Sequence, residues 1–387
     1  MRKHSQKTPP SPFTSQISRR DFLQIAGAVA AGSFLSSCGL NTPNSTPTSA
    51  GTIDPKFATP LSGTRPLVAI AQANSYERKL IRQQVQNLFE NLGGVADVVS
   101  RGDKIAIKVN LTGGTGSLPK SGVPATEYHI LHPEVVRAVG ELLTDAGARE
   151  LFIVEAVSDA QSFPLWGYTE VAKGLNAKLI DLNQPDPYPD FAALPVGAGW
   201  LIYENLTMNR ILQEVNAFVS VAKMKSHCTA GVTLSMKNLV GLVPMNNYRL
   251  SNLDGYRSAF HGAEKGKNTR LPKVIVDLNR ARPIHLSVVE GVITSEGGEG
   301  PWTIYTKQVK PGVLLAGKSP LATDAVAASV MGFDPTSEGP AEPFLQSDNY
   351  LNIAYTKGLG TNRLDEIDTV GVPLADVRFP FAACREW

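Results

Sequence analysis

Strand-like and helix-like segments alternate along residues 66–331, and this alternation constrains the fold more than any other feature of the sequence. Apolar runs of strand length lie at 66–73, 104–110, 151–156, 217–224, 284–293 and 312–316. Between them, apolar residues recur at helical spacing over 80–92, 132–143 and 321–331. Such alternation is typical of βαβ units. We therefore predict an α/β fold, a mainly parallel wound sheet with helices on both faces, built as one body or as two intimate lobes.

The first 37 residues have the pattern of an export signal. Residues 18–23, SRRDFL, form a twin-arginine motif, and the apolar stretch 25–35 that follows is too short to span a membrane. Cys38 comes after small residues, as a lipoprotein signal peptidase requires. We predict that the twin-arginine machinery exports the chain and that residues 1–37 are removed as a signal peptide. Lipid at Cys38 would then anchor the protein to the membrane at the extracytoplasmic face of the cell envelope.

Residues 38–63 are rich in Ser, Thr and Pro and have almost no large apolar residue, which predicts a flexible tether. Residues 64–387 then form a single α/β domain. Its connections at 184–200 and 245–272 are long and rich in Pro, Gly or Asn, and loops of that length are usually lids, binding loops or mobile segments. Twin-arginine export carries folded proteins, often because a cofactor is inserted inside the cell. The sequence therefore leaves open whether this domain binds a divalent metal or a phosphorylated cofactor.

Charge and cysteine content limit the partners and cofactors. Residues 1–37 hold five basic residues and one acidic residue, so the remaining chain has 32 Lys and Arg against 34 Asp and Glu. A near-neutral domain argues against nucleic acid as a partner. Besides Cys38 the chain has only Cys228 and Cys384, too few for a Cys-ligated iron–sulfur cluster or a four-thiolate zinc site. The sequence leaves open whether these two cysteines pair.

Polar residues gather where the predicted strands end, which is the edge at which parallel sheets bind ligands. They are Lys108 and Asn110 after the second strand, Glu155 after the third, Lys223, Lys225 and His227 after the fourth, and Glu290, Glu296 and Glu299 after the fifth. A Gly-rich loop at 112–117 either surrounds an anion with backbone N–H groups or is a plain flexible loop.

Lys223, Lys225 and His227 alternate, so on a continuing strand they project to one side and can grip a phosphate or a carboxylate. A solvated strand end is the alternative explanation.

A predicted helix over 229–240 places Thr229, Thr233 and Lys237 in one row that points into a cleft. A partly exposed helix edge is the alternative.

Histidine spacing gives a second interpretation of the site. His129 and His132 stand three residues apart, as in some metal sites, although His132 also fits a helix cap. A metal-dependent variant of the site uses His132, Glu155 or His227 as ligands.

Two blocks, Lys223-x-Lys225-x-His227 and Thr233-x-x-x-Lys237-Asn238-x-x-Gly241, resemble the domain of unknown function number 362 family. Further blocks agree in order: His132-Pro133-Glu134-Val135-Val136, Asp277-Leu278-Asn279, Glu290-Gly291, Glu296-Gly297-Gly298-Glu299-Gly300-Pro301, and Ala316-Gly317 with Ala322-Thr323-Asp324-Ala325-Val326. The resemblance implies the family's fold and a pocket, but the family's reaction is not established. Some relatives are iron–sulfur proteins through an added ferredoxin-like segment, whose cysteines this chain lacks.

The sequence is compatible with three functions. The first is an enzyme of redox or isomerase type that binds an anionic substrate or a phosphorylated cofactor. Its predicted ligand-binding residues are Asn110, Lys223, Lys225, Thr233, Lys237 and Asn238, and its predicted catalytic residues are His227, Glu296 and Glu299. The second is an extracytoplasmic binding protein for an anionic small molecule, without catalysis. The third is a structural partner in an envelope complex.

Overall fold

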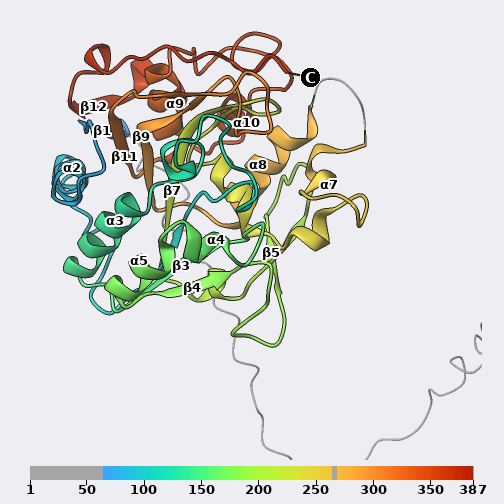
Figure 1. Cartoon of the computed structure of the whole chain (residues 1–387), viewed down its shortest axis with the longest axis horizontal. Helices are drawn as coiled ribbons and strands as arrows, with labels where there is room; N and C mark the ends of the chain where they lie inside the picture. Colours follow the sequence, from blue (N-terminus) through green and yellow to red (C-terminus); the bar gives the residue numbers. More distant parts are fainter. Residues whose placement is uncertain (1–63, 264–267, 387) are drawn as a thin grey trace, which may run out of the picture. The chain divides into compact units, whose positions relative to one another are not determined.

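The computed structural model describes residues 64–263 and 268–386, which belong to one compact unit. Their centre is a ten-stranded sheet (Figure 1), in the order β12-β1-β11-β9-β7-β2-β3-β4, with β10 beside β9 and β8 beside β7. The strands are β12 (Asp368–Gly371), β1 (Leu67–Gln72), β11 (Val313–Gly317), β9 (Leu286–Glu296), β7 (Ala217–His227), β2 (Lys104–Lys108), β3 (Glu150–Glu155), β4 (Lys178–Asp181), β10 (Lys307–Val309) and β8 (Gly231–Thr233). The predicted signal, tether and Cys38 lie outside the described residues.

The sheet is mainly parallel, as predicted. Five of its nine strand pairings are parallel and four are antiparallel. The parallel block runs β4-β3-β2-β7-β9, so the carboxyl ends of these strands meet at one edge. A separate two-stranded sheet pairs β5 (Ala192–Pro195) with β6 (Asn205–Met208).

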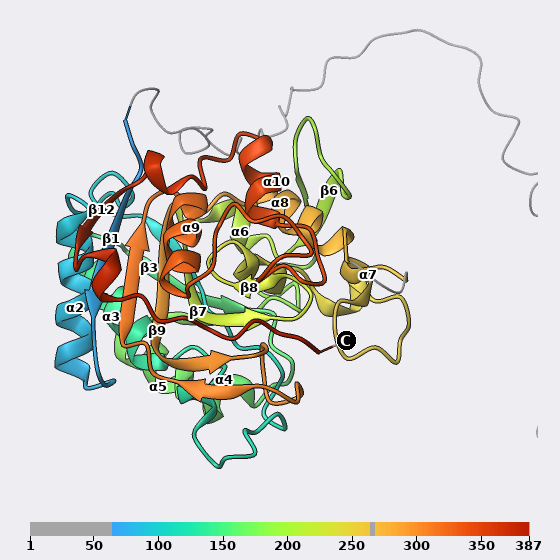
Figure 2. The ribbon, with the colours of Figure 1, turned by 90° about the horizontal axis from the view of Figure 1, so that it is seen from above.

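Helices cover both faces of the sheet, which confirms the predicted α/β class (Figure 2). Successive residues of β1 show the two faces: Val68 and Ile70 belong to one buried cluster, and Ala69 and Ala71 belong to the other. The first cluster includes residues of α8 (Arg270–Ala281), α9 (Pro320–Val330) and α10 (Tyr350–Thr356). The second includes residues of α2 (Arg78–Asn91), α3 (Pro133–Asp145) and α5 (Tyr168–Leu175).

The remaining elements are short. They are the helices α4 (Ser162–Leu165), α6 (Ile211–Glu214) and α7 (Ser258–His261), and the 3-10 turns η2 (Ala125–Glu127), η3 (Lys237–Leu242), η4 (Met245–Tyr248), η5 (Leu364–Glu366) and η6 (Leu374–Asp376). In the part of the chain that the structure covers, every helix is too short or too polar to cross a membrane.

The helix predicted over 229–240 is wrong. The chain turns back after His227, and β8 pairs antiparallel with the end of β7, so Thr233 lies opposite Lys225. Gly231 permits this turn because its φ of +72° favours glycine, and an added Cβ would lie 2.6 Å from the ring of Phe344. The apolar spacing that predicted a helix reflects burial of most of the segment, which periodicity alone does not separate from a helix.

Candidate functional site

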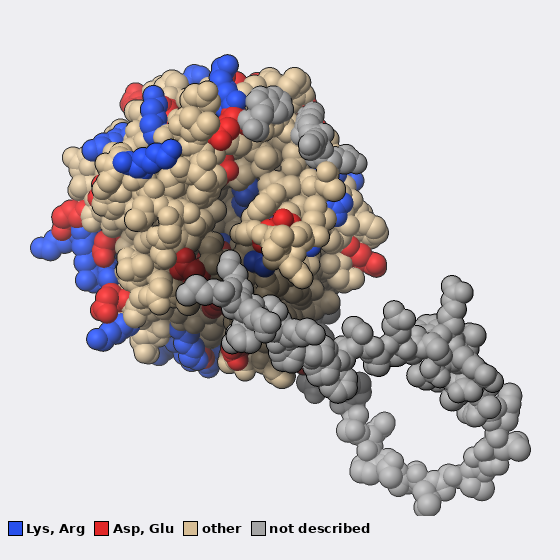
Figure 3. Space-filling model, turned by 45° about the vertical axis from the view of Figure 1, so that its right-hand side comes forward, with Lys and Arg blue, Asp and Glu red and all other residues tan. Residues whose placement is uncertain are grey.

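A small pocket opens where β2 and β3 end, beside η3. Its volume is about 90 Å³, and its lining includes Lys108, Asn110, Glu155, Lys237, Asn238 and Arg257. Figure 3 shows Lys and Arg side chains inside a hollow on one face of the molecule. The pocket therefore lies at the edge that the strand ends predicted, and cationic groups contribute to its lining.

The floor of the pocket is a buried ion pair. Lys108 Nζ lies 2.8 Å from Glu155 Oε1, and the other carboxylate oxygen accepts a 3.0 Å hydrogen bond from the backbone N–H of Leu111. Gly241 packs against this pair, since an added Cβ would lie 2.1 Å from the carboxylate of Glu155. Glycine is needed here for this close approach, and Glu155 serves the ion pair instead of facing a metal.

Asn238 joins three elements and has no capacity left for a ligand. Its oxygen accepts from Lys108 Nζ at 3.2 Å and from Asn110 Nδ2 at 3.0 Å. Its nitrogen donates to the Ser220 hydroxyl and to the backbone oxygens of residues 108 and 221. The structure thus gives Asn238 a positioning role. Asn110 Oδ1, in contrast, is buried without a hydrogen-bond partner among the described residues and can accept from a ligand.

Lys223 is placed in a second buried ion pair, away from the pocket lining. Its ammonium group donates to Glu290 Oε2 at 2.7 Å, to the backbone oxygen of Thr126 at 3.0 Å and to the Tyr76 hydroxyl at 3.2 Å. Neither Lys223 nor Glu290 has any exposed side-chain surface. A lysine has three N–H donors, so none of these is left for an anion.

Lys225 and Lys237 lack such partners. Lys225 Nζ donates to the backbone oxygen of His129 at 2.9 Å, and among the described residues no carboxylate pairs with either lysine. Burial, with the nearby charge of Lys237, lowers the pKa of Lys225 to about 7. Burial lowers the pKa of Lys237 to about 8, although Glu299 attracts its charge. Thr233 lies opposite Lys225, and its hydroxyl is buried without a hydrogen-bond partner in the described chain.

His227 is a neutral imidazole. Burial, with the charges of Lys237, His261 and Lys225, holds its pKa well below the usual range. Its Nδ1 accepts a 3.2 Å hydrogen bond from the backbone N–H of Thr229. In the neutral ring the proton then sits on Nε2, so His227 presents a hydrogen-bond donor and not a base to a ligand.

The two predicted acidic residues occupy different surroundings. Glu299 Oε2 lies 3.9 Å from His227 Nδ1 and accepts from the backbone N–H of Cys228 at 3.0 Å. Glu296 instead pairs with Lys307 at 2.9 Å and accepts from the backbone N–H of Ala382 at 2.8 Å. The structure brings Glu299 to His227, while Glu296 holds the C-terminal segment.

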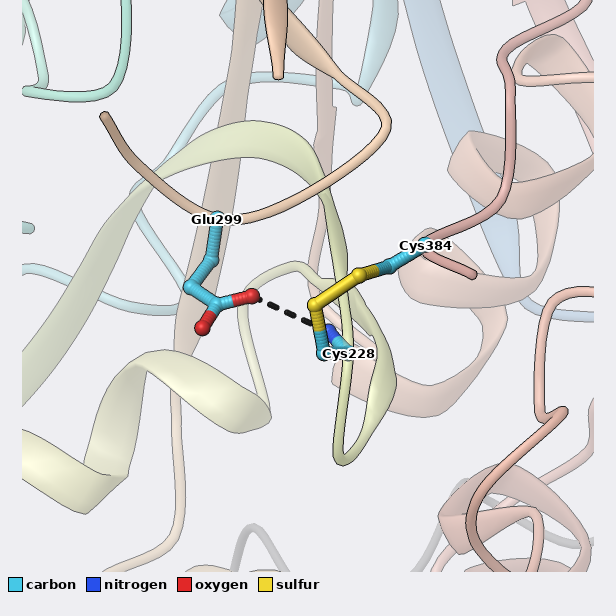
Figure 4. A group of neighbouring side chains, drawn as sticks. All are labelled: Cys228, Glu299 and Cys384. Atoms are coloured by element: carbon cyan, nitrogen blue, oxygen red, sulfur yellow. Dashed lines mark hydrogen bonds between the residues drawn. A yellow bond between two sulfur atoms is a disulfide. The ribbon is translucent and has the colours of Figure 1, made fainter. Parts of the chain in front are cut away.

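A disulfide settles the question that the sequence left open. Cys228 and Cys384 are bonded, with their Cα atoms 4.8 Å apart, next to Glu299 (Figure 4). In the described chain these three residues form the one group whose potential metal-ligating atoms all lie within 4.8 Å of one another. Since the sulfurs are bonded to each other, they are not thiolate ligands.

The metal candidates His132, Glu155 and His227 do not form such a group in the described structure. His132 caps α3, where its Nδ1 accepts from the backbone N–H of Glu134 at 3.3 Å. Its ring stacks on Tyr76 with the centroids 3.6 Å apart, and burial lowers its pKa to about 3. The helix-cap alternative is therefore what the structure shows for His132.

Sequence reasoning missed Arg257. Its guanidinium lines the pocket and donates to the backbone oxygen of Val243 at 2.9 and 2.7 Å. Burial lowers its pKa to about 10, which leaves it charged at neutral pH. The one signal that pointed toward it was the long connection 245–272, for which the sequence left a lid, a binding loop or a mobile segment open.

Several residues of the motif blocks hold the turn that precedes Lys237. Asp324 accepts hydrogen bonds from the backbone N–H groups of Ser235 and Met236, both at 2.9 Å. Asn279 Nδ2 donates to the backbone oxygen of Met236 at 3.0 Å. Burial raises the pKa of Asp324 to about 7. These contacts fix where η3 begins and hence where the Lys237 side chain leaves the backbone.

The site is thus a cationic pocket at the carboxyl edge of an exported α/β domain. A family model described as "Domain of unknown function (DUF362)" matches residues 105–329, and the chain belongs to this family. A twin-arginine translocation signal model matches residues 16–36, which indicates export across the membrane. Both findings confirm the resemblance and the signal inferred from the sequence.

The chain is also similar to other known proteins. It is 27% identical to a thylakoid-associated protein of Synechocystis over 272 residues, which are 70% of this chain and 76% of that protein. The lactate racemase apoprotein of Thermoanaerobacterium thermosaccharolyticum aligns with a TM-score of 0.40 and 11% identity, over 69% of this chain and 57% of that one. A Thermotoga maritima protein aligns with a TM-score of 0.31 and 13% identity, over 62% and 57%. The chain thus spans little more than half of each of these two structures.

Proposed function

We propose that the protein is a lipid-anchored extracytoplasmic enzyme, of isomerase or redox type, that binds an anionic substrate or a phosphorylated cofactor in the pocket. The observation that carries the proposal is that Lys237, which lines the pocket, and the neighbouring buried Lys225 form no ion pair with a carboxylate of the described residues, although Glu299 attracts both charges. Burying a cation without a counter-charge costs several kcal/mol by general estimates. A bound anion between the two lysines and Arg257 would supply that counter-charge.

The groups around the pocket suit proton transfer to and from a carbon acid. The pKa values of Lys225 and Lys237, about 7 and about 8, lie where a lysine exchanges protons at neutral pH. When Lys225 is neutral, Lys237 and Arg257 would hold the anion. Lys225 would then accept a proton from a carbon next to a carbonyl or carboxyl group, and the C–H electron pair would move onto the oxygen. Charged Lys237 and the Nε2–H of His227 would stabilise that oxyanion, and Lys225 would return the proton to the carbon.

Solute binding without catalysis is the second candidate. The tautomer of His227 favours it, because the ring presents no basic nitrogen to the ligand. The carboxylate of Glu299 is occupied as well, by the N–H groups of Cys228 and Trp302. Under this reading the lysines hold the anion and no bond changes.

Titration calorimetry with inorganic phosphate and with succinate tests anion binding. Lys237→Ala should weaken the affinity for the bound anion at least tenfold, which corresponds to about 1.4 kcal/mol. Lys307→Ala is the matched control, because this lysine is mostly exposed and pairs with Glu296. Equal affinities in wild type and Lys237→Ala, or no binding of either anion to the wild type, would refute the proposal.

Proton exchange separates the two candidates. Small carboxylates with acidic C–H bonds are incubated with the protein in D₂O and followed by proton NMR. An enzyme exchanges the C–H proton of at least one of them, and Lys225→Met loses this exchange. A protein that binds a carboxylate but exchanges none of these protons fits the solute-binding candidate.

The lipid anchor is tested separately. Metabolic labelling with a tagged fatty acid should mark the wild type, and Cys38→Ala should lose the label and leave the membrane fraction. A label that persists in Cys38→Ala would refute lipid attachment at this cysteine.

A further inference from the structure

Exposed apolar side chains concentrate on three loops at the site. Ten large apolar side chains of the described chain are exposed, and seven of them lie on loops 112–123, 249–257 and 300–306. They are Leu118, Leu250, Leu253, Tyr256, Trp302, Ile304 and Tyr305, which we call the apolar rim. Scattered exposed apolar residues need no explanation, but a concentration of them marks a place of interaction.

One rim residue, Trp302, contacts groups that neighbour the lysines. Trp302 Nε1 donates to Glu299 at 3.1 Å, and its ring centroid lies 5.6 Å from that of His129, whose backbone oxygen binds Lys225. Trp302 also packs on loop 112–123, because an added Cβ on Gly113 would lie 2.3 Å from its ring. Tyr256 precedes the pocket residue Arg257 in the chain.

The size of the pocket requires that a larger ligand extend beyond it. A volume of about 90 Å³ holds a head group of a few heavy atoms. A second hollow of about 300 Å³ lies between two of the rim segments, and its lining mixes Val123, Tyr128, Pro301 and Ile304 with the polar residues Lys120, Ser121, Thr303, Thr306, Lys307 and Gln308. Apolar surface next to an anion site offers burial to an apolar chain attached to the anion.

We propose that the ligand of the cationic pocket is an anionic amphiphile, with its oxyanion head group among Lys225, Lys237 and Arg257 and its apolar chain along the rim. This inference rests on the proposed anion site and adds the chemical class of the ligand. A small hydrophilic anion would gain nothing from the rim, whereas an apolar chain gains free energy with each methylene that leaves water.

Alkyl phosphates of increasing length test the inference. The full chain carrying Cys38→Ala, so that no lipid is attached, is titrated calorimetrically with methyl, butyl and octyl phosphate below their micelle concentrations. A fully buried methylene is worth roughly fourfold in affinity. Because the rim is partly open, we expect octyl phosphate to bind at least about 30-fold more tightly than methyl phosphate.

Substitutions on the rim give the decisive comparison. Ile304→Ser and Tyr256→Ser should each weaken octyl phosphate binding several-fold and leave methyl phosphate binding unchanged. Both side chains are largely exposed, so these variants should fold. Leu364→Ser, an exposed leucine on η5, is the matched control and should change neither affinity.

The outcomes separate the ligand class from the anion site itself. Methyl phosphate binding that Lys237→Ala abolishes, without any gain from chain length, would overturn the amphiphile and leave the anion site standing. Octyl phosphate binding that Lys237→Ala does not weaken would overturn the amphiphile as well, because the chain would then bind apart from the pocket. Sedimentation with phosphatidylcholine vesicles, with and without phosphatidylglycerol, shows whether the amphiphile is a bilayer lipid. Rim-dependent binding to the anionic vesicles alone supports the inference with a bilayer lipid as ligand.

Discussion

Removing the charge of Lys223 should destabilise the fold and spare the anion site. In Lys223→Met the Glu290 carboxylate loses its ion-pair partner in a place without solvent exposure. Two other donors remain to it, the Tyr76 hydroxyl at 2.6 Å and the backbone N–H of Val292 at 2.9 Å. Breaking a buried ion pair from one side typically costs about 3–5 kcal/mol, and we expect a loss of this order in the free energy of unfolding.

Removing both charges of the pair should lower the free energy of unfolding much less than removing one. In Lys223→Met/Glu290→Leu no charge stays buried, and the main losses are the acceptor of the Val292 N–H and one of the two acceptors of the Tyr76 hydroxyl, which keeps the Ile293 oxygen, together worth about 1–3 kcal/mol. The coupling energy between the two substitutions should therefore be at least about 2 kcal/mol. Urea denaturation of the wild type, both single variants and the double variant measures it. Lys318→Met is the control, since its pair with the exposed Asp97 should contribute about 1 kcal/mol or less.

The refuting result is a stable Lys223→Met protein that no longer binds phosphate. It would mean that Lys223 faces the ligand, as the alternation of Lys223, Lys225 and His227 predicts, and that the ion pair with Glu290 is not the reason for its presence. Retained phosphate affinity with lowered stability supports the structural role.

Three further predictions concern the disulfide, the lysines and a buried acid. Replacing Cys228 and Cys384 by Ser should lower the free energy of unfolding by about 2–5 kcal/mol in urea without reductant, because the bond closes a loop with a sequence separation of 156; an unchanged value would contradict a closed disulfide. Sulfate affinity, measured by calorimetry, should fall at least about tenfold from pH 6 to pH 9 as Lys225 and Lys237 lose their protons; a flat profile would count against their role. Asp324 has a raised pKa, so its contribution to stability is present at low pH and is lost as pH rises from about 4 to about 7; Asp324→Asn should flatten this slope in urea titrations at several pH values, and an unaltered slope would refute the assignment.

Much of the fold follows from the sequence because strand and helix periods are local signals. The segments 66–73, 104–110 and 151–156 became β1, β2 and β3 within two residues at each end. The order of the strands was not visible, since β1 lies between β11 and β12 and not beside β2. The pairing of β1 depends on residues more than 200 positions away, which no local pattern shows.

The sequence predicted where the site lies, but only some of the residues that form it. A charged residue after a strand shows which edge of the sheet binds ligands. It does not show whether that residue already forms an ion pair with another side chain. Lys223 and Lys225 look equivalent in sequence. Only Lys223 forms an ion pair, with the carboxylate of Glu290, which lies 67 positions later. Arg257 reaches the pocket from a loop without any periodic pattern, so only the loop's length and composition pointed to it.

The motif blocks supply Lys225 and Lys237 together with the residues that support them, whereas the apolar rim lies outside these blocks. Asp324 and Asn279 bind the backbone of residues 235–236, Asn238 binds groups on β2 and β7, and Gly241 makes room for the Lys108–Glu155 pair. Their shared effect is to hold Lys237 at the pocket. The groups that would contact the rest of a ligand, in contrast, lie on the loops that carry the apolar rim. Members that keep the blocks but differ in these loops should therefore bind a common anionic group attached to different bodies.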